Sequence, residues 1–514
     1  MKLITVLVFA FGIAPSIGYN ILCVFPVPSK SHNHLGKGIV QSLLQAGHKV
    51  TWATPYPDKK EIKNLKYIDV SEILQLIDGI DMTKPDTQKL SFMTEFSKNV
   101  FVMAAENKQL REVLVKEQFD AVVTEFFFSD LPAGFAAVQQ VPWIMLNSVS
   151  IHPVIEHLVD EVRSVSTVPS VMSDNIAPMN YLERLANTAT TSFMLLLSWW
   201  ERSGDLYENL YSPLAKARGV ELKPLSSAVY NASILLLNSH PSITPAFALP
   251  PNAIEVAGYH IDEDIPPLPK DLQEILDSST NGVVYFSMGS VLKSSVLSEV
   301  TRRGIIQVLG ELPYTVLWKF EEHIEGLPKN VHTRAWMPQP SILAHHNVKL
   351  FITHSGMLST LEAIHHGVPL LAVPVFGDQP SNALRSVRAG YALSVPYEEN
   401  FAPKLKDALN KMLSDDRYYN RAKYLSKLFR NRLVSPKKLI AHYVEVAIET
   451  KGAYHLRSNS RFYTWYQRMM LDQIAGLLLV LYLVYYFLRR VATKLFGRTT
   501  KKEDLDKRKS KKNK

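Results

Sequence analysis

Short apolar runs alternate with helical stretches along most of the first half of the chain. An amphipathic helix is expected over 35–46, following a loop over 26–33, because Ile39, Val40, Leu43 and Leu44 recur at helical spacing. Continuous apolar runs predict strands buried on both faces, as in a parallel sheet. These runs lie at 21–25, 50–53, 121–124 and 144–146.

The alternation begins again after a proline-rich stretch between Pro250 and Pro269, which reads as an interdomain linker. The second set of predicted strands lies at 283–287, 315–319, 331–334, 349–353 and 370–373. We therefore expect two doubly wound α/β domains, over 19–265 and 266–455. Open sheets of this kind bind ligands at the carboxyl ends of their strands, which places the expected site in a cleft between the halves.

The segment from 151 to 229 departs from this alternation, because it is rich in Met, Phe, Trp and Leu. Residues 193–200 are almost wholly apolar, yet eight residues are too few to cross a bilayer. Core packing, the wall of an apolar pocket and contact with a membrane surface all remain open for this segment.

Both ends of the chain carry targeting patterns. Residues 1–18 have a lysine, an apolar run and small residues where a signal peptidase would cleave, which favours a signal peptide over a buried first strand. Residues 469–488 form an apolar stretch about 30 Å long as a helix, which fits the bilayer core. The following tail, 489–514, is too polar to cover a buried helix, so we expect a transmembrane helix.

Charge separates the tail from the body. The tail has 12 basic and 3 acidic residues, a net charge of +9, which equals that of the whole chain. The body has no charge surplus with which to bind nucleic acid, so we exclude that class. A basic flank after a span marks the cytoplasmic side. Together with Lys511 and Lys512, which resemble a dilysine retrieval signal, this predicts a type I single-pass protein of the endoplasmic reticulum membrane with lumenal domains.

Two further residues bear on the lumenal environment. Cys23 is the single cysteine, so no intrachain disulfide can form, and its apolar surroundings indicate a small buried side chain. Asn231-Ala232-Ser233 is a glycosylation sequon, whose occupancy the sequence leaves open.

Polar side chains gather where three consecutive strands of the second half end, between Trp336 and Gln379. After the strand at 331–334, Trp336 can stack on a flat base and Gln339 can pair with the edge of a pyrimidine. After the strand at 349–353, Gly356 and the start of a helix favour an anion. His354 and Ser359 can each hydrogen-bond a phosphate oxygen.

The remaining polar groups in this segment suit sugars. Glu362 lies one turn into the same helix, where its carboxylate can accept from both ribose hydroxyls. Asp378 and Gln379 end the next strand and can bond the hydroxyls of a hexose. The three loops therefore offer contacts for a base, a diphosphate with ribose, and a sugar, in chain order.

The run FITHSGMLSTLEAIHHGVPLLAVPVFGDQ resembles the signature of the UDP-glycosyltransferase family with unbroken spacing, and WMPQ and VYFSMGS resemble its flanking motifs. The resemblance covers nearly the whole chain and is greatest to insect microsomal members. It implies the GT-B fold, with two Rossmann-like domains facing a cleft, an N-terminal acceptor domain and a C-terminal UDP-sugar domain, here followed by the transmembrane helix.

The resemblance also implies roles for individual residues. Trp336 and Gln339 would bind uracil, and Glu362 the ribose. Ser290, His354, Gly356 and Ser359 would hold the diphosphate, and Asp378 and Gln379 the sugar. Many members have Asn where this chain has Leu358, which implies the loss of one phosphate contact, about 1 kcal/mol.

The family's general base is a histidine after the first strand, and the match falls on His32 rather than His34. A neutral imidazole suits removal of a proton from an acceptor hydroxyl. In the family an aspartate orients this histidine. Glu125 occupies the matching place, and Asp130 is the alternative.

The implied reaction is an inverting hexosyl transfer to a hydroxyl of a small lipophilic acceptor. It needs no metal and no cofactor beyond the co-substrate, since no Asp-x-Asp pair is positioned to carry Mn²⁺. The acidic run Asp262-Glu263-Asp264 favours UDP-glucose over UDP-glucuronic acid if it lies near the donor. A transferase acting on membrane lipids and a non-catalytic receptor or chaperone on the same fold are the alternatives. The sequence leaves open whether the chain forms homo- or hetero-oligomers.

Overall fold

A computed structural model describes residues 18–512, except for 81–83, 160–164, 166–167, 171–174, 176–177, 201–202, 245–247 and 290–296. The predicted signal peptide therefore lies outside the described residues, apart from Gly18, and so does Ser290. The described part forms two compact units, one ending at Arg457 and one over 458–512.

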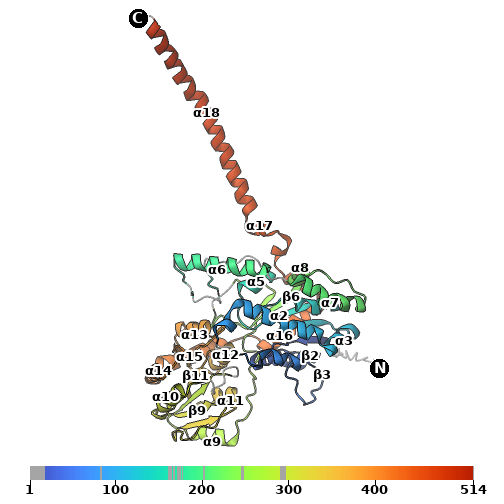
Figure 1. Cartoon of the computed structure of the whole chain (residues 1–514), viewed down its shortest axis with the longest axis vertical. Coiled ribbons are helices and arrows are strands. Elements are labelled where there is room, and N and C mark those ends of the chain that lie inside the picture. Colours follow the sequence, from blue (N-terminus) through green and yellow to red (C-terminus); the bar gives the residue numbers. More distant parts are fainter. Residues whose placement is uncertain are drawn as a thin grey trace, which may run out of the picture. The chain divides into compact units, whose positions relative to one another are not determined.

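The first unit contains two parallel sheets, which can be followed in Figure 1 as blue to green and as yellow to orange strands. The first sheet has the order β3-β2-β1-β4-β5-β6-β7. Its strands are β1 (Asn20–Val24), β2 (Lys49–Thr54), β3 (Leu65–Asp69), β4 (Ala121–Phe126), β5 (Trp143–Asn147), β6 (Ala232–Leu237) and β7 (Ala253–Glu255).

The second sheet repeats this order as β10-β9-β8-β11-β12-β13. Its strands are β8 (Val283–Ser287), β9 (Thr315–Lys319), β10 (Val331–Arg334), β11 (Val348–Thr353), β12 (Leu370–Ala372) and β13 (Ala392–Ser394). All strand pairs are parallel, and the order 3-2-1-4-5-6 is that of the doubly wound Rossmann fold. The two predicted α/β halves are thus confirmed.

Helices cover both faces of each sheet. Those of the first half are α1 (Lys30–Gln45), α2 (Leu90–Glu106), α3 (Lys108–Lys116), α4 (Ala133–Gln139), α5 (Pro153–Val159), α6 (Tyr181–Trp200), α7 (Gly204–Arg218) and α8 (Leu225–Ala228). After the linker come α9 (Lys270–Ser278), α10 (Glu299–Gly310), α11 (Gln339–Ala344), α12 (Met357–His366), α13 (Gln379–Arg388), α14 (Ala402–Ser414), α15 (Asp416–Arg430) and α16 (Pro436–Glu449). Short 3₁₀ turns occur at η1 (Ser71–Ile77), η2 (Pro85–Gln88), η3 (Val229–Asn231), η5 (Tyr454–Leu456) and η6 (Asn459–Phe462).

Alternate residues of β1 show that the first sheet is buried on both faces. Leu22 packs into a core with α2, α3 and α7, whereas Ile21 packs into a core with α1 and α16. The helix α16 belongs by sequence position to the second half, yet Ile440 and Val444 lie in the core of the first half. The chain therefore crosses back after the second sheet is complete, which apolar periodicity alone does not reveal.

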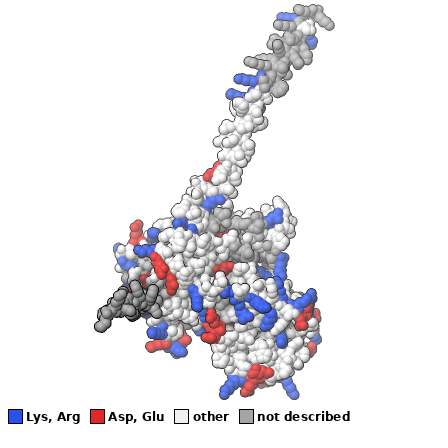
Figure 2. Space-filling view, turned by 180° about the vertical axis from the view of Figure 1, so that it is seen from behind, with Lys and Arg blue, Asp and Glu red and all other residues white. Residues whose placement is uncertain are grey.

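The second unit contains α17 (Trp465–Arg468) and α18 (Leu471–Lys512). Residues Leu471–Lys494 of α18 are long and apolar enough to cross a membrane, with a mean hydropathy of 1.8 and no part of the stretch buried. In Figure 2 the helix is mostly white over this stretch, and blue side chains become frequent toward its far end. This helix contains most of the predicted span at 469–488.

Candidate active site

The topology predicts two ligand-binding crevices in the first unit. In each sheet the strand order reverses next to the first strand, at β1 and β4 in the first sheet and at β8 and β11 in the second. Loops after such strands diverge to opposite faces and leave a binding crevice at the carboxyl ends. Among the described candidate residues, His32 follows β1 and Glu125 lies near the end of β4. The residues from His354 to Glu362 follow β11, and only the Trp336 and Asp378 loops follow other strands.

His32 and Glu125 meet at the first crevice. Glu125 is the fifth residue of β4, and His32 lies in the first turn of α1, directly after β1. His32 Nδ1 lies 2.5 Å from Glu125 Oε1, and the Glu125 side chain is fully buried. This contact fixes the imidazole so that Nδ1 carries the proton and Nε2 is the free acceptor. Asp130 instead lines the pocket described below.

The pKa of His32 is raised although its surroundings are largely dry. Burial alone would lower this pKa, but the carboxylates of Glu125 and, more weakly, Asp378 outweigh that effect. Asp378 belongs to the second half, so a carboxylate of that half acts on the imidazole of the first half. Phe127 packs edge-on against the imidazole, with ring centroids 5.0 Å apart.

The start of α1 differs from the sequence-based expectation of a loop over 26–33 followed by a helix at 35–46. The helix begins at Lys30, after Ser29 in an extended conformation. Apolar periodicity could not locate this start, because the first five helical residues, KSHNH, contain no apolar side chain. The helical geometry directs His34 away from the position of the base. Its ring packs instead against that of His260, with ring centroids 5.7 Å apart.

Three of the predicted nucleotide contacts form one network. Gln339 Nε2 donates to Ser359 Oγ at 3.0 Å and to Glu362 Oε2 at 2.8 Å. Trp336, three residues before Gln339, leaves 65% of its surface exposed, which is the condition for stacking on a base. The structure thus gathers the residues expected to bind uracil and ribose.

Glu362 is buried, and burial raises its pKa to about 7 against the opposing effect of the Gln339 hydrogen bond. On its other oxygen, Oε1, the nearest described cation-forming group is His260 Nε2, 3.8 Å away. Burial holds the pKa of His260 well below its ordinary value, so this imidazole is neutral and supplies no compensating charge. Hydrogen bonds from hydroxyl groups would therefore stabilise the ionised carboxylate of Glu362.

His354 lies between two glycines at the second crevice. A Cβ built on Gly289 would lie 2.6 Å from His354 Cε1, and one built on Gly356 would lie 2.5 Å from His354 Nε2. Only glycine at both positions leaves room for the ring. Burial, followed by the nearby charge of Lys319, lowers the pKa of His354 to about 4. A neutral imidazole here can donate a single N–H to a phosphate oxygen.

The N-terminus of α12 opens beside this ring. Gly356 is its N-cap, no side chain caps the helix, and its first turn contains no acidic residue. Unpaired N–H groups and the helix dipole favour an anion at this point. Leu358, where the resemblance implied a polar Asn in many members, packs against the apolar core of the first half that includes Ile39 and Tyr259. The departure thus exchanges a polar contact for an apolar contact between the halves.

Asp378 and Gln379 behave differently from one another. Asp378 Oδ2 accepts a hydrogen bond from Asn382 Nδ2 at 2.6 Å. The charges of Asp378 and His32 also interact. Gln379 is buried, and its Oε1 accepts from the backbone N–H groups of Val375 and Phe376 at 2.9 and 3.2 Å. Gln379 therefore shapes its own loop, and only its Nε2 amide is available to a sugar hydroxyl.

Sequence reasoning did not single out Lys319, Gly289 or Asn382. Lys319 ends β9 with its side chain buried, and its Nζ donates to Gly289 O at 2.9 Å and to Glu321 Oε1 at 2.6 Å. Asn382 joins the sugar loop to the phosphate loop, since its Nδ2 also donates to Ser355 O at 3.1 Å. A lysine at the end of an apolar strand was the one available signal for Lys319.

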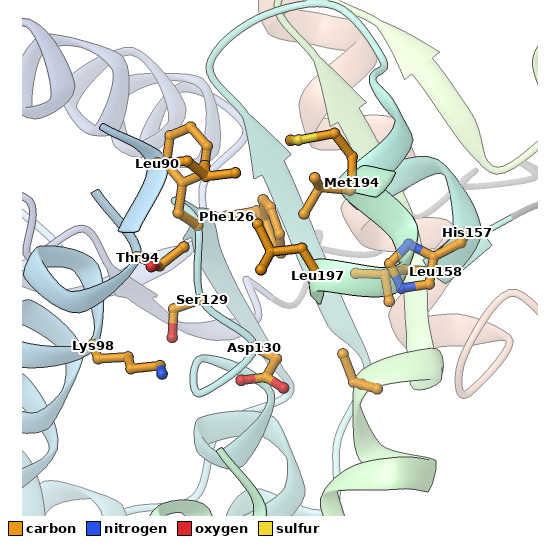
Figure 3. Close-up of a pocket in the computed structure, with 13 residues that line it drawn as sticks. Leu90, Thr94, Lys98, Phe126, Ser129, Asp130, His157, Leu158, Met194 and Leu197 are labelled. Carbon is orange, nitrogen blue, oxygen red and sulfur yellow. The ribbon is translucent and has the colours of Figure 1, made fainter. Parts of the chain in front are cut away.

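An apolar pocket with a cavity volume of about 60 Å³ lies in the first half. Figure 3 shows Leu90, Phe126, Met194 and Leu197 in the upper part of the view, and Ser129, Lys98 and Asp130 below them. Phe128 also lines the pocket and packs against Phe127, which in turn contacts His32. The pocket is therefore two aromatic rings away from the imidazole.

The acidic run 262–264 does not join the donor contacts. Asp262 pairs with Lys437 of α16 at 2.8 Å, and the run borders a second hollow together with Ser42 and Gln45, near the end of α1. His32 lies in the first turn of the same helix. The acidic run therefore gives no reason to prefer glucose over glucuronic acid. Among the described residues, no group of three or more His, Cys, Asp or Glu side chains could hold a metal ion.

Comparison with solved structures identifies the fold as GT-B. The glycosyltransferase VinC in complex with dTDP matches with a TM-score of 0.56 at 17% identity, over 84% of this chain and 100% of the other. The calicheamicin glycosyltransferase CalG4 matches with a TM-score of 0.55, also at 17% identity, over 84% and 99%. At such identities the likeness concerns the fold alone.

Sequence comparisons reach further. UDP-glucosyltransferase 2 of Dactylopius coccus is 31% identical over 93% of both chains. UDP-glucuronosyltransferase 2B15 of Rattus norvegicus is 28% identical over 86% of this chain and 87% of its own. The family model described as UDP-glucoronosyl and UDP-glucosyl transferase matches residues 22–505. The chain is a glycosyltransferase that belongs to this UDP-glucoronosyl and UDP-glucosyl transferase family.

Proposed function

We propose that this enzyme transfers a hexosyl group, glucose in preference to glucuronic acid, from a UDP-sugar to a hydroxyl of a small lipophilic acceptor. Transfer proceeds with inversion, and His32 is the general base. The observation that carries the proposal is the 2.5 Å contact between His32 Nδ1 and the buried Glu125, with Asp378 facing the same imidazole from the other half.

In the proposed step, His32 Nε2 takes the proton of the acceptor hydroxyl while the oxygen of that hydroxyl forms a bond to the anomeric carbon. The bond between that carbon and the diphosphate oxygen breaks, and UDP leaves with the electron pair. Glu125 positions the imidazole and stabilises the imidazolium that forms. The N-terminus of α12 and a neutral His354 stabilise the charge that develops on the leaving diphosphate.

Preference for glucose is supported by the charges around the base. Glu125 and Asp378, both carboxylates, are the groups that raise the pKa of His32. A hexose that itself carries a carboxylate would add a third negative charge to this region. The relatives named above include transferases named for each sugar, so only the charges of the site favour glucose here.

The apolar pocket beside Phe128 supports a lipophilic acceptor. Its walls are mainly aliphatic and aromatic. Phe128, which lines it, packs against Phe127, and Phe127 contacts the imidazole that would take the acceptor's proton. This lining suits contact with the apolar part of an acceptor that has few polar groups.

Product formation with UDP-glucose and with UDP-glucuronic acid, each against a panel of phenols and lipid extracts, tests the proposal. We expect glucosides of small phenols, and loss of about 10²-fold or more in kcat for His32→Ala with UDP binding retained. Full turnover by His32→Ala would overturn the role of the base. Transfer to membrane lipids alone would replace the proposed acceptor class.

We also propose that the catalytic body is lumenal in the endoplasmic reticulum, with α18 as the single span and the basic tail in the cytosol. The asymmetry of basic residues around the apolar stretch supports this orientation. Protease treatment of sealed microsomes should remove only the tail, and degradation of the body would reverse the orientation.

A further inference from the structure

The helix α6 has apolar side chains on two opposite faces. On the inner face, Met194 is buried and Met194 and Leu197 line the acceptor pocket. On the outer face, Leu182, Leu185, Phe193 and Leu196 are 71%, 55%, 61% and 65% exposed. With Ala189, these positions are spaced by three and four residues, so they form one continuous stripe.

The orientation of this helix is fixed by a buried polar side chain. Asn187 is fully buried on the inner face, where its Nδ2 donates to Val165 O and Val168 O at 2.8 and 3.0 Å. Its Oδ1 accepts from Ser170 N at 2.8 Å. Rotation of α6 to hide the outer stripe would break all three bonds and leave a buried amide unpaired.

The stripe is also free of charge. From Leu185 to the end of α6 the sequence, LANTATTSFMLLLSWW, has no charged residue, and Glu183 and Arg184 near the start are the only two. A soluble surface helix normally carries charges on its outer face, and an exposed apolar stripe of this size marks an interaction surface.

The place where the chain leaves the first unit argues that the occupant is a lipid surface. Arg457, the last residue of that unit, donates to Asn231 Oδ1 at 2.9 Å and to Ser233 Oγ at 3.1 Å. Asn231 ends η3, η3 packs against α5, and α5 packs against α6. The stripe-bearing helix therefore lies on the part of the body from which the chain continues to the membrane helix.

The connection is also short. Leu471, the first residue of α18, follows Arg457 by only 14 positions, which can extend over about 50 Å at most. A bilayer is thus the nearest extended apolar phase within reach of the stripe.

We propose that the outer stripe of α6 docks on the lipid surface, so that this helix separates the bilayer from the acceptor pocket and admits acceptors dissolved in the membrane. The acceptor class becomes membrane-partitioned hydroxyl compounds, and this part rests on the proposed function. Docking itself does not depend on which reaction the enzyme performs.

Full-length protein in phosphatidylcholine nanodiscs tests the docking. Leu185→Cys and Leu196→Cys each carry an environment-sensitive fluorophore, and the single native thiol, Cys23, is fully buried and stays unlabelled. Val300→Cys on α10, 62% exposed in the second half, is the matched control. We expect blue-shifted emission that lipid-borne doxyl groups quench at 185 and 196, and water-like emission at 300.

Two outcomes overturn the docking. Emission at 185 and 196 that equals the control places the stripe in water. A blue shift that doxyl lipids do not quench assigns the stripe to contact with protein, such as a second copy of the chain.

Turnover tests the access route. Leu185→Glu combined with Phe193→Glu should raise KM for a long-chain alkylphenol while turnover of a short, water-soluble phenol stays unchanged, and Val300→Glu should alter neither. Equal effects on both phenols would overturn the route. Absence of transfer to any phenol in the unmodified enzyme would refute the proposed function, whereas the fluorescence result would still decide the docking.

Discussion

A Cβ atom on Gly356 would lie 2.5 Å from Nε2 of His354, closer than side-chain atoms approach in folded proteins. Gly356 has a φ of −59°, which any residue adopts, so glycine is required here for space and not for backbone conformation. The imidazole that would contact the diphosphate can therefore occupy its place only because residue 356 has no side chain.

Gly356→Ala should displace His354 and weaken UDP binding about tenfold or more, which corresponds to the loss of one or two hydrogen bonds to a charged ligand. Titration with UDP and with uridine separates the effects, because uridine lacks the diphosphate and should bind almost normally. Gly204→Ala is the matched control, since nothing lies within 4 Å of a Cβ there. Equal weakening of uridine and UDP binding would contradict the assignment.

The pH profile of the reaction should report the His32–Glu125 pair. Because Glu125 raises the pKa of His32, the unprotonated base forms only above that raised value, and kcat/KM should fall as the pH drops through it. Glu125→Gln removes the negative charge, so the acid limb should move to lower pH while kcat at neutral pH decreases.

Asp378→Asn should move the acid limb in the same direction but less, because Asp378 is the weaker of the two influences on His32. The measurement is kcat/KM from about pH 5 to 9 for each variant, across the ordinary histidine range. An acid limb that stays in place in Glu125→Gln would show that another group titrates in this range.

Glu362→Gln should stabilise the protein at high pH although it weakens donor binding. In the folded state the pKa of Glu362 is raised from 4.5 to about 7, so its contribution to stability is present below pH 4.5 and is lost as the pH rises to 7. The free energy lost is about 3 kcal/mol, as an order of magnitude.

The measurement is thermal unfolding of both proteins without ligand from acidic to alkaline pH. The difference in Tm should be small at low pH, grow through neutrality and then stay constant. A difference independent of pH would mean that the carboxyl group does not change protonation on folding. UDP affinity of the unmodified enzyme should rise over the same interval, since the ionised form accepts the ribose hydroxyls.

Leu358→Asn exchanges an apolar contact between the halves for a potential phosphate ligand. We expect a lower Tm, because a partly buried leucine loses about 1–2 kcal/mol of apolar burial. UDP affinity should increase by up to about fivefold, the equivalent of one added hydrogen bond. Differential scanning fluorimetry and UDP titration measure the two effects, and unchanged UDP affinity would mean that residue 358 does not reach the phosphate.

The sequence predicted most of the sheet strands because parallel strands buried on both faces are continuous apolar runs. The expected strand at 283–287 matches β8, and that at 121–124 lies within β4. β3 (Leu65–Asp69) was not predicted, since it is an edge strand whose residues are mostly polar or half-exposed. β7 (Ala253–Glu255) and β13 (Ala392–Ser394), with three residues each, are too short to give a pattern. β6 (Ala232–Leu237) was also not predicted, although it is a buried apolar run of the expected kind.

The candidate site was predicted as three separate loops, and the structure adds how they connect. Gln339, Ser359 and Glu362 share one hydrogen-bonded network, and Asp378 acts on His32 from the other half. Such relations depend on side-chain directions and on how the two sheets meet, neither of which leaves a periodic signal. The start of α1, which carries His32, was missed for the related reason that its first turn is wholly polar.

The return of α16 to the first sheet affects how the protein can be divided for study. Its buried residues Ile440, Val444 and Ala447 complete a core that includes residues of β1, β4 and α1. A donor-binding fragment that begins at the linker and ends at 455 would expose these apolar side chains to water, which favours aggregation. A fragment ending near Ser435 would avoid that surface, and a synthetic peptide with the sequence of α16 should restore an acceptor half that was made without it.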